Sequence, residues 1–418
     1  MGSRTRVVIV GGGMAGARLA QQLGNGGTAA VTVLAEEPHA PYNRVLLAEV
    51  LAGRYPPEVI ALPGPPEGVT WRGGVRVMRV DRAERRVVCD DGAVLPYDAL
   101  VLATGSNAVL PPLSGLFGPG PGGGELPDHV RAFRTLDDCL ALRAAIAERE
   151  GVPAVVIGGG LLGVSAARAL AAGGARVVLA HQGEHLMERQ LDPGAAALLR
   201  AHLAEQGVEV HTECRVRALR DPGVELANGF RLDAGLVVLA CGVRPRSGLA
   251  RAAGLEMGAR SGAVLVDDRL RTSDPHIHAL GDCAEHDGVH YGLAGAARDQ
   301  ADVLARVLGG DEAARYGGTR ALVRLTLSHA GAGEGADGPL DLAAFGETVP
   351  GHGDDVVQLA DATRGAYRKL VVRGDRLRGG ILVGDLASVG TLARAWEDDE
   401  PLPAATPLLH LLTHDGGY

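Results

Sequence analysis

The stretches Gly11-Gly12-Gly13-Met14-Ala15-Gly16 and Gly158-Gly159-Gly160-Leu161-Leu162-Gly163 decide the fold of this chain. Each follows a short β-branched run, at residues 6–10 and 154–157, and each opens an alanine-rich stretch typical of a helix. In such a strand-turn-helix unit the first glycine makes the tight turn, the second lets a pyrophosphate approach the backbone, and the third lets helix and strand pack closely. Two such turns predict a chain that binds two dinucleotides. The simplest pair of dinucleotides for one chain is FAD and NAD(P)H.

Length and composition set the broad class. The chain has 418 residues, enough for two or three domains, with 46% hydrophobic and 22% charged residues. Its net charge of -9 and its lack of a basic cluster argue against nucleic acid and anionic membranes as primary partners. No apolar run approaches the roughly 18 residues of a membrane span, and a strand that starts almost at residue 4 leaves no room for a signal peptide. We therefore expect a cytoplasmic protein.

The cysteines and histidines predict no disulfide, dithiol or metal centre. The five cysteines are widely spaced and contain no CxxC or CxxxxC pair: Cys89, Cys139, Cys214, Cys241 and Cys283. A flavin in this chain is therefore expected to deliver its electrons directly rather than through a paired thiol. The histidine pairs His181/His185 and His276/His278 lack companions at ligand spacing, so we expect no metal site.

The first glycine turn is followed by a candidate ribose acceptor. The sequence predicts a strand at residues 6–10, a helix at about residues 15–23 and a strand at residues 31–34, which leads into Glu36-Glu37. An acidic residue about 20 positions beyond the glycines is what a ribose hydroxyl pair needs as acceptor. We assign Glu36 to this role, with Glu37 as the alternative.

The chain between the two glycine turns is predicted to form a β-meander followed by a connection between domains. Strands are expected at residues 74–80, 86–89 and 97–102, and the last one closes at Thr104-Gly105, where a backbone can approach a cofactor closely. Proline and glycine dominate residues 111–127, which predicts a connection between domains.

The whole unit, and not only its turn, occurs twice. The run YDALVLATGS at residues 97–106 is paralleled by LDAGLVVLACGVRP at residues 232–245. A helix is expected at about residues 294–308. Further on, apolar runs such as residues 368–372 and 379–385 predict strands, and the glycine-rich residues 327–341 predict a long surface loop. We expect an α/β chain that ends in an α+β domain.

Several motifs together resemble a known family over nearly the full chain. They are EEPHAPYNRVLLAEVLAG (36–53), ATG (103–105), FRTLDDCLALR (133–143), HLMERQLDP (185–193), GVRP (242–245), ALGDCAE (279–285) and GGILVGDL (379–386). The chain resembles the pyridine nucleotide-dependent flavin reductases of the two-Rossmann, glutathione reductase-like fold. Within them it is most similar to the flavoprotein part of NAD(P)H nitrite reductase large subunits, with ferredoxin and rubredoxin reductases next.

The resemblance implies a domain layout. It comprises an FAD-binding domain at residues 1–112 and 245–317, an NAD(P)-binding domain at residues 113–244, and a C-terminal α+β domain at residues 318–418. Nitrite reductase large subunits continue into an iron-sulfur and siroheme half with cysteine-rich motifs, whereas no cysteine follows Cys283 here. We therefore expect a reductase module.

The resemblance also implies the residues that hold FAD. Asp282 is similar to the aspartate that accepts from the ribityl chain, and Glu36 takes the adenosine ribose. The remaining positions implied to contact FAD are Gly11, Gly13, Ala15 and Gly16 at the pyrophosphate, Val77 at the adenine, Arg44 and Arg134 directed at the cofactor, Thr104 and Gly105 close behind it, and Ala294 near the flavin ring.

For the nicotinamide nucleotide, the implied residues are Gly158, Gly160 and Gly163 in the turn and Gly242 at the opposite strand end. His181 closes the second strand. A carboxylate at this position would accept hydrogen bonds from the ribose diol, and an arginine would bind a 2'-phosphate. A histidine at this position favours neither NADH nor NADPH. NADH is slightly preferred, because no arginine stands beside His181, although Arg189 could reach in.

One departure from the family pattern concerns the charges near the flavin. Many relatives carry a glutamate two residues after the last glycine of the second turn, and some pair it with a lysine that follows an LS step. These positions are Ser165 and Glu49 here. They are candidate catalytic residues, with a solvated helix face as the alternative for Glu49.

The function expected from these residues is that of an FAD-dependent NAD(P)H oxidoreductase that passes electrons to a separate acceptor. The acceptor is a ferredoxin-like protein, a partner reductase subunit or a small molecule, and the protein itself a monomer or homodimer. Two alternatives remain open. One is a flavin oxidase or reductase that acts directly on a small metabolite, and the other is a flavin-bound assembly subunit that no longer turns over.

Overall fold

The computed structural model describes residues 4–27, 29–117, 126–320, 322–327, 339–402 and 408–412. The predicted connection and the predicted long loop lie partly outside these ranges. The chain forms two compact units, and each is described by itself. Unit 1 comprises Met1–Leu47, Pro56–Asn107 and Val243–Thr319, and unit 2 comprises Ala48–Tyr55, Ala108–Gly242 and Arg320–Tyr418.

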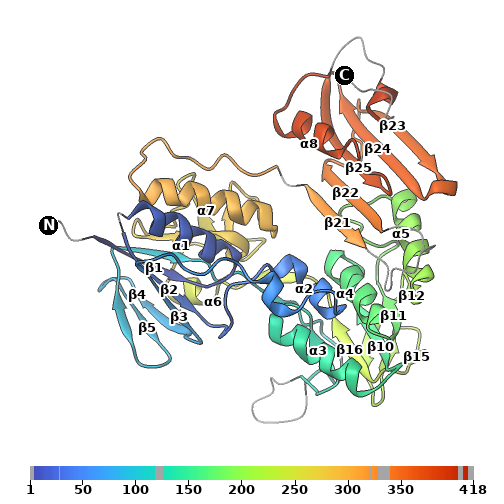
Figure 1. Cartoon of the computed structure of the whole chain (residues 1–418), viewed down its shortest axis with the longest axis horizontal. Helices are drawn as coiled ribbons and strands as arrows, with labels where there is room; N and C mark the ends of the chain where they lie inside the picture. The colour runs from blue at the N-terminus through green and yellow to red at the C-terminus, as the bar shows by residue number, and fades with distance from the viewer. Residues whose placement is uncertain are drawn as a thin grey trace. The chain divides into compact units, whose positions relative to one another are not determined.

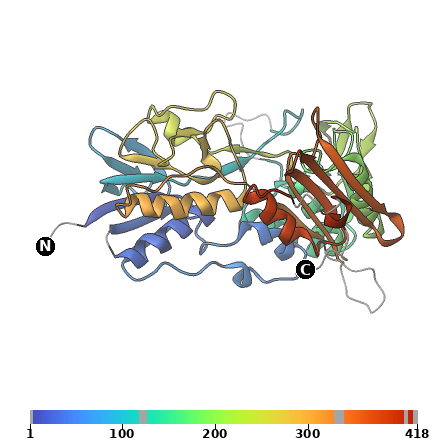
Figure 2. The same ribbon diagram turned by 90° about the horizontal axis from the view of Figure 1, so that it is seen from above.

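Unit 1 is built on a five-stranded parallel sheet with the order β19-β7-β1-β2-β3. Its strands are β1 (Thr5–Val10), β2 (Ala29–Ala35), β3 (Val69–Gly73), β7 (Ala99–Leu102) and β19 (Ile277–Ala279). Helices α1 (Met14–Gly26) and α7 (Ala294–Leu308) pack side by side over one face of the sheet (Figure 1, Figure 2). The helix expected at residues 294–308 is confirmed.

Strand β7 corrects part of the predicted meander. All four of its residues are buried, and a strand buried on both faces belongs inside a covered parallel sheet. It therefore lies beside β1, with Leu100 opposite Val8, instead of closing the meander. The remaining meander is the antiparallel sheet of β4 (Val77–Asp81), β5 (Arg86–Cys89) and β6 (Val94–Pro96), which packs on the face of the large sheet opposite α1.

Shorter elements complete unit 1. They are η1 (Arg44–Leu46), η2 (Pro57–Ile60), β8 (Ser106–Ala108), β17 (Val243–Pro245), α6 (Gly248–Ala252), β18 (Val264–Val266), η3 (Gly281–Cys283) and β20 (Ala284–His286). The edge strand β3 was not expected from the sequence. It pairs in parallel with β2, and Trp71 lies opposite Val33.

Unit 1 is expected to lose stability in mild acid through His278 of β19. Burial lowers the pKa of His278 from 6.5 to about 4, and its side chain is only 4% exposed. The unfolded chain therefore binds this proton first, so the contribution is complete above pH 6.5 and is lost as the pH falls toward about 4. We expect a loss of about 1.4 kcal/mol for each pH unit in this window.

Urea unfolding of the wild type and of His278→Gln at about pH 7.5 and about pH 5 measures this contribution. The wild type should lose more stability between the two conditions than the variant. Equal losses would show that His278 takes up no proton on unfolding.

Unit 2 repeats the first architecture. Its parallel sheet has the order β12-β11-β10-β16-β9. The strands are β9 (Val130–Ala132), β10 (Pro153–Ile157), β11 (Arg176–Ala180), β12 (Val208–His211) and β16 (Leu236–Leu239), and the helices are α3 (Leu136–Glu148), α4 (Leu161–Ala172) and α5 (Pro193–Glu205). The prediction of two Rossmann-like sheets is confirmed, because both glycine turns follow the central strand of a parallel sheet.

The C-terminal part of unit 2 is an antiparallel sheet with the order β21-β22-β25-β24-β23. Its elements are β21 (Val323–Leu327), β22 (Leu340–Gly346), β23 (Asp355–Asp361), β24 (Ala366–Arg373), β25 (Arg376–Val383) and α8 (Val389–Glu397). Helix α8 packs against β22 and β25 through a core that includes Phe345, Leu382 and Leu392. The predicted α+β character is confirmed.

The remaining elements of unit 2 are α2 (Leu47–Leu51), β13 (Val216–Leu219), β14 (Val224–Leu226), β15 (Arg231–Leu232), η4 (Ala362–Arg364) and η5 (Leu408–Leu412).

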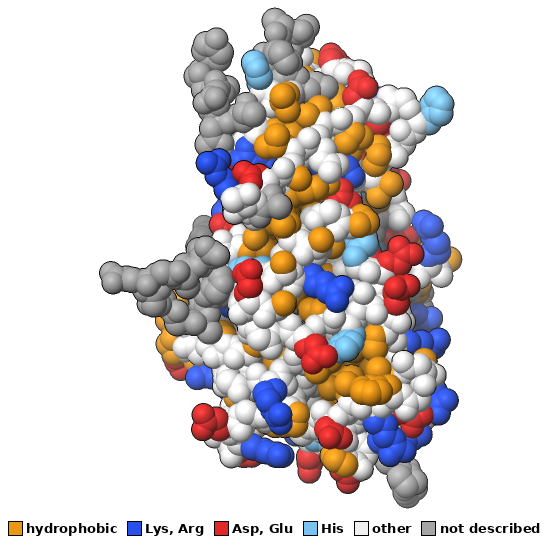
Figure 3. All heavy atoms as spheres, turned by 90° about the vertical axis from the view of Figure 1, so that its right-hand side faces the viewer, with side chains coloured by type: hydrophobic (Ala, Val, Ile, Leu, Met, Phe, Trp, Pro, Cys, Tyr) orange, Lys and Arg blue, Asp and Glu red, His pale blue; other side chains and the backbone are white. Residues whose placement is uncertain are grey.

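Among the described residues, no helix has the length and apolar character that crossing a membrane requires. Basic and acidic side chains are interspersed on the face that Figure 3 draws.

Asp192 joins the second Rossmann sheet to the C-terminal sheet within unit 2. One of its carboxylate oxygens accepts from the backbone N–H of Ala195 (3.0 Å) and so caps α5. The other accepts from the hydroxyl of Tyr367 (2.6 Å) and from the ammonium group of Lys369 (2.8 Å), both on β24. Burial raises the pKa of Asp192, but these hydrogen bonds outweigh it, so the pKa is lowered below 3.8.

Candidate functional site

Three of the four glycines of the first turn, Gly11, Gly13 and Gly16, lie in different surroundings. Gly11 follows β1 with a φ of +117°, and an added Cβ would collide with the carbonyl of Ala103, which directly follows β7. A Cβ on Gly16 would collide with the carbonyl oxygen of Gly11. At Gly13 nothing lies within 4 Å of an added Cβ. The turn is therefore tight against the sheet and open at its middle glycine.

The second turn has the same geometry. Gly158 has a φ of +115° and faces the carbonyl of Ala240, and a Cβ on Gly163 would collide with the carbonyl oxygen of Gly158. Nothing lies within 4 Å of a Cβ on Gly160. The open space beside Gly160, the second glycine of the GxGxxG pattern, is the space that a pyrophosphate needs for close approach.

The helices that follow these turns begin without a side-chain cap. Gly13 and Gly160 are the N-cap residues of α1 and α4, and no side chain of the described residues caps either helix. By contrast, Thr135 and Asp138 form a capping box on α3, and Asp192 caps α5. The N–H groups in the first turns of α1 and α4 are therefore left to hydrogen-bond phosphate oxygens.

Glu36 lies directly after β2 and is held by two arginines. Its two carboxylate oxygens pair with Arg76 and Arg246. The backbone of Arg246 is fixed in turn, since its carbonyl accepts from the hydroxyl of Thr104 (2.6 Å) and its N–H donates to the carbonyl of Gly105 (2.9 Å). Three predicted residues, Glu36, Thr104 and Gly105, are thus linked through Arg246, which the sequence analysis missed.

Glu37, the alternative ribose acceptor, has other partners. Its carboxylate accepts from Arg44 (2.6 Å) and from the hydroxyl of Tyr42 (2.7 Å). The guanidinium of Arg44 also lies 5.0 Å from the centre of the Tyr42 ring. Glu37 therefore fixes Arg44. Both glutamates are paired with arginines, so the assignment of the ribose to Glu36 stays a prediction that rests on its position directly after β2. Val77 opens β4 directly after Arg76, the partner of Glu36.

Asp282 follows β19 and lies close to the first glycine turn. Its carboxylate accepts from the hydroxyl of Ser106 (2.7 Å), and its carbonyl bonds to Nε2 of His290 (2.9 Å). The preceding Gly281 has a φ of +75°, and an added Cβ would come within 3.3 Å of Ala15 in the first turn of α1. The residue before Asp282 thus lies against the first turn of α1.

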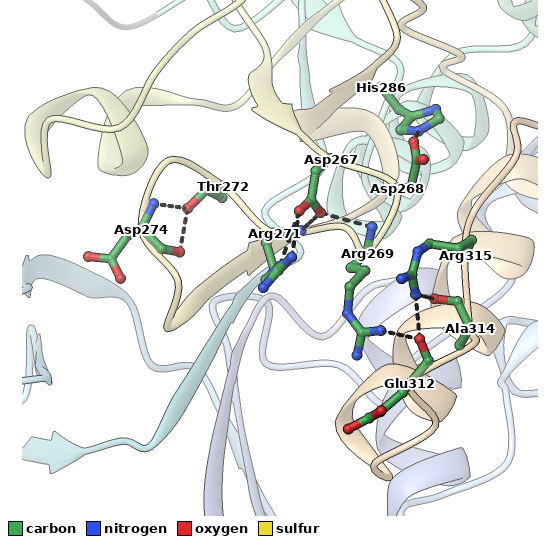
Figure 4. A network of polar contacts seen from close by, with 10 residues as sticks. All are labelled: Asp267, Asp268, Arg269, Arg271, Thr272, Asp274, His286, Glu312, Ala314 and Arg315. Atoms are coloured by element: carbon green, nitrogen blue, oxygen red, sulfur yellow. Dashed lines mark hydrogen bonds and ion pairs between the residues drawn. The ribbon is translucent and has the colours of Figure 1, made fainter.

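A polar network joins residues of the turn at 267–274 and the end of β20, the strand that follows Asp282 (Figure 4). Asp267 accepts from the backbone N–H groups of Arg269 (2.8 Å) and Arg271 (2.9 Å) and closes the turn before β19. Nε2 of His286, at the end of β20, lies 2.9 Å from the Asp268 carboxylate. The end of β20 is therefore anchored to this turn, and β19 is anchored as well, because the backbone N–H of Ala279 donates to the carbonyl of Leu270 (3.1 Å).

Two further predicted FAD contacts are Ala294 and Arg134. Ala294 is the first residue of α7, whose N-cap, Leu293, makes no side-chain cap among the described residues. Arg134 belongs to unit 2 and precedes α3, where its backbone N–H donates to the carboxylate of Asp138 (3.0 Å). Both contacts remain predictions.

The expected nicotinamide nucleotide residues gather around the second turn. His181 lies directly after β11, and its Nδ1 accepts from the backbone N–H of Gly159 at 3.1 Å. Gly242 lies beyond the end of β16 with a φ of +99°. Strand β16 pairs with β10, so the Gly242 backbone lies at the same sheet edge as the turn.

Glu49 faces a buried arginine rather than solvent. Its side chain is 16% exposed and pairs with Arg168 of α4, which is 1% exposed, and with Arg54 at 3.1 Å. Ser165, one turn before Arg168 on α4, donates its hydroxyl to the carbonyl of Leu161 (2.8 Å). The family pattern implies a cation on the α2 side and a carboxylate on α4. Here the carboxylate is on α2 and the cation on α4.

Arg168 could have been found from the sequence. It is the only charged residue in α4, whose sequence is LLGVSAARALAA, and most of that helix is buried. A charged side chain inside such a helix requires a partner of opposite charge. Arg246, in contrast, lies in an irregular segment, and nothing in the sequence around it indicates that it would pair with Glu36.

Two family models match this chain. That of the pyridine nucleotide-disulphide oxidoreductases matches residues 5–301. That of the rubredoxin NAD+ reductase C-terminal domain matches residues 339–399. The chain belongs to the pyridine nucleotide-disulphide oxidoreductase family.

Individual relatives and solved structures agree with this assignment. The chain is 34% identical to the NAD(P)H nitrite reductase of Bacillus subtilis over 91% of its own length, but it spans only 46% of that protein. It is 32% identical to the rubredoxin-NAD(+) reductase of Pseudomonas putida, over 68% of this chain and 74% of that one. The ferredoxin reductase for the CYP199A2 system from Rhodopseudomonas palustris is 26% identical, with a TM-score of 0.82 over 98% of this chain and 99% of that one.

The cofactors of this oxidoreductase family are FAD and NAD(P)H, and the prediction of this pair is confirmed at the level of the family. The residues present fit both groups. Each turn leaves an open face at its second glycine, at Gly13 and Gly160, and each leads into a helix whose first N–H groups no described side chain caps.

In this family setting, Asp282→Ala is expected to weaken FAD retention. The substitution removes a charge-assisted hydrogen bond to the flavin, which is on the order of 1.5 to 3 kcal/mol. Flavin retained on gel filtration and titration of the apoprotein measure the effect. Ser106→Ala is the control, because it removes the hydroxyl on Asp282 and keeps the carboxylate. Unchanged retention in Asp282→Ala would contradict the assignment.

Proposed function

We propose that this chain is an FAD-dependent NAD(P)H:acceptor oxidoreductase that passes electrons from NAD(P)H through FAD to a separate acceptor. The duplication of the open glycine turn, at Gly13 and at Gly160, carries this proposal. When bound, FAD would supply the redox chemistry that links hydride donation by the nicotinamide nucleotide to electron delivery to the acceptor. We place the reaction in the cytoplasm, in agreement with the expectation from the sequence.

The residues of the chain bind and orient the two cofactors. In unit 1, the first turn holds the FAD pyrophosphate, Glu36 accepts from the adenosine ribose, and Asp282 accepts from the ribityl chain. In unit 2, the second turn holds the pyrophosphate of NAD(P)H, and the backbone near Gly242 lies at the same sheet edge. Orientation of the reactants is the main contribution that a protein makes to hydride transfer between two cofactors.

The cysteines support direct delivery of electrons from the flavin. All five are free, and burial raises the pKa of both Cys139 and Cys241 to about 11. A thiol with so high a pKa is almost entirely protonated near neutral pH and is a poor nucleophile. We therefore propose that no cysteine pair takes part in the reaction.

The acceptor that we favour is a redox protein or a partner reductase subunit. The match of the rubredoxin NAD+ reductase C-terminal domain to residues 339–399 supports this choice, as does the likeness to one half of a nitrite reductase. Direct reaction with a small metabolite is the second candidate, because the charges at Glu49 and Arg168 are reversed relative to the family pattern.

Anaerobic stopped-flow mixing of the FAD-loaded protein with NADH and with NADPH tests the proposal. Bleaching of the flavin spectrum by at least one nucleotide is expected, followed by reoxidation on addition of rubredoxin, a ferredoxin or a small-molecule acceptor. A yellow protein that neither nucleotide bleaches would overturn the proposal in favour of a flavin-bound assembly subunit.

A further inference from the structure

The end of β11 lacks the residue that usually recognises the adenosine ribose of a nicotinamide nucleotide. In a dinucleotide-binding fold, a carboxylate at the end of the second strand accepts from the ribose 2'-hydroxyl, and that carboxylate disfavours a 2'-phosphate. The position is occupied by His181, whose side chain is 14% exposed. A carboxylate does lie beside His181, and it belongs to Glu188 in the loop that follows β11.

The hydrogen bond from Gly159 fixes the orientation of His181. Because Nδ1 accepts from the backbone N–H of Gly159 (3.1 Å), the proton of the neutral ring resides on Nε2. Nε2 is buried and has no hydrogen-bond partner among the described residues. The atom opposite it is Oε2 of Glu188, at 3.7 Å. The Nε2–H group of His181 therefore faces the Glu188 carboxylate at a distance too long for a direct hydrogen bond.

The loop after β11 brings Glu188 back to the glycine turn. Oε1 of Glu188 accepts from the backbone N–H of Glu184 (2.9 Å), and the backbone N–H of Met187 donates to the carbonyl of Gly159 (2.9 Å). The Glu188 carboxylate lies against Gly183, because an added Cβ on Gly183 would meet this flexible end of the Glu188 side chain. The carboxylate is 44% exposed and thus accessible to a ligand.

We infer that Glu188 is the residue that selects NADH over NADPH. Its carboxylate accepts from the adenosine ribose diol and repels a 2'-phosphate, and His181 is a positioning residue that ties Glu188 to the second glycine turn through Gly159. This inference rests on the proposed function. It resolves the choice of nucleotide that the histidine at the strand end left open.

The competing arrangement is a 2'-phosphate bound beside the loop. A cavity of about 210 Å³ is lined there by Glu184, His185, Arg200 and Thr212, among others. Arg200 and His185 would attract a phosphate, but the carboxylate of Glu184 lines the same cavity. Preference for NADPH would assign the ribose end to this cavity and not to Glu188.

Calorimetric titration of the FAD-loaded protein with NAD+ and with NADP+ tests the inference, in parallel with flavin reduction by NADH and NADPH. The wild type should prefer the unphosphorylated nucleotides. Glu188→Gln keeps an acceptor for the Glu184 N–H and removes only the charge, so the preference should fall by about tenfold or more. Glu184→Gln is the matched control in the same loop and should keep the preference of the wild type.

A preference for NADP+ in the wild type, or an equal preference in wild type and Glu188→Gln, would overturn the inference. Glu188→Lys adds a second measurement, because it should bind NADP+ more tightly than the wild type does. Failure of the proposed function is distinguishable: NAD+ would then bind with the expected preference while NADH leaves the flavin oxidised.

Discussion

Gly160→Val is expected to abolish reduction of the flavin by NAD(P)H while FAD stays bound. The backbone at Gly160 has a φ of -78°, which valine adopts, and nothing lies within 4 Å of the new Cβ. The added Cβ therefore meets no described atom of the protein, and the side chain occupies the space that the pyrophosphate needs. The rate of flavin reduction in stopped-flow mixing should fall by at least about a hundredfold, with the FAD spectrum intact.

Gly13→Val is the matched control at the first turn. Gly13 also has an extended backbone, with a φ of -73°, and an open face, so this variant should fold and lose FAD instead. Gly163→Val differs from both, because its Cβ would collide with the backbone of Gly158 and destabilise the turn itself. A Gly160→Val protein that loses FAD and is still reduced by NADH would show that the roles of the two turns are exchanged.

Glu49→Ala is expected to destabilise unit 2 by about 3–5 kcal/mol, because it removes the carboxylate opposite the guanidinium of Arg168, which is 1% exposed. Burial already lowers the pKa of Arg168, and the nearby Glu49 opposes this effect. The midpoint of urea unfolding measures the loss. Arg54→Ala is the control, since Arg54 is 35% exposed and its pair with Glu49 is worth about 1 kcal/mol or less.

The double variant Glu49→Leu with Arg168→Met separates charge burial from packing. Replacing both partners of a buried pair by apolar residues is often neutral or stabilising. We therefore expect the double variant to recover most of the stability that Glu49→Ala loses. Full stability in Glu49→Ala alone would contradict the pair as a buried interaction.

Local sequence signals predicted the elements whose structure depends on neighbouring residues. The bounds of α7 and of β5 follow the sequence closely, because helical periodicity and a turn at Asp90-Asp91-Gly92 are local. Strand β7 was placed in the wrong sheet, since its partner β1 lies about 90 residues earlier in the chain and the run alone does not identify that partner.

The polar partners of the candidate site were less predictable. The glycines and Glu36 have a fixed spacing, which the phosphate and ribose chemistry imposes. The pairing of Arg246 with Glu36 depends on a segment that returns from far along the chain. Glu188 reaches the end of β11 because the loop folds back on the second glycine turn, where the Met187 N–H donates to the Gly159 carbonyl, and a loop of this kind leaves no periodic signal in the sequence.

The carboxylate of Asp192 has a consequence for cooperativity. It caps α5 and at the same time holds Tyr367 and Lys369 of β24, so separating the C-terminal sheet would also disturb the start of α5. A bond from the ring of His202 on α5 to the carbonyl of Leu327 (3.2 Å) adds a second link. We therefore expect α5 and β24 to open together as one foldon in native-state hydrogen exchange, with similar protection free energies.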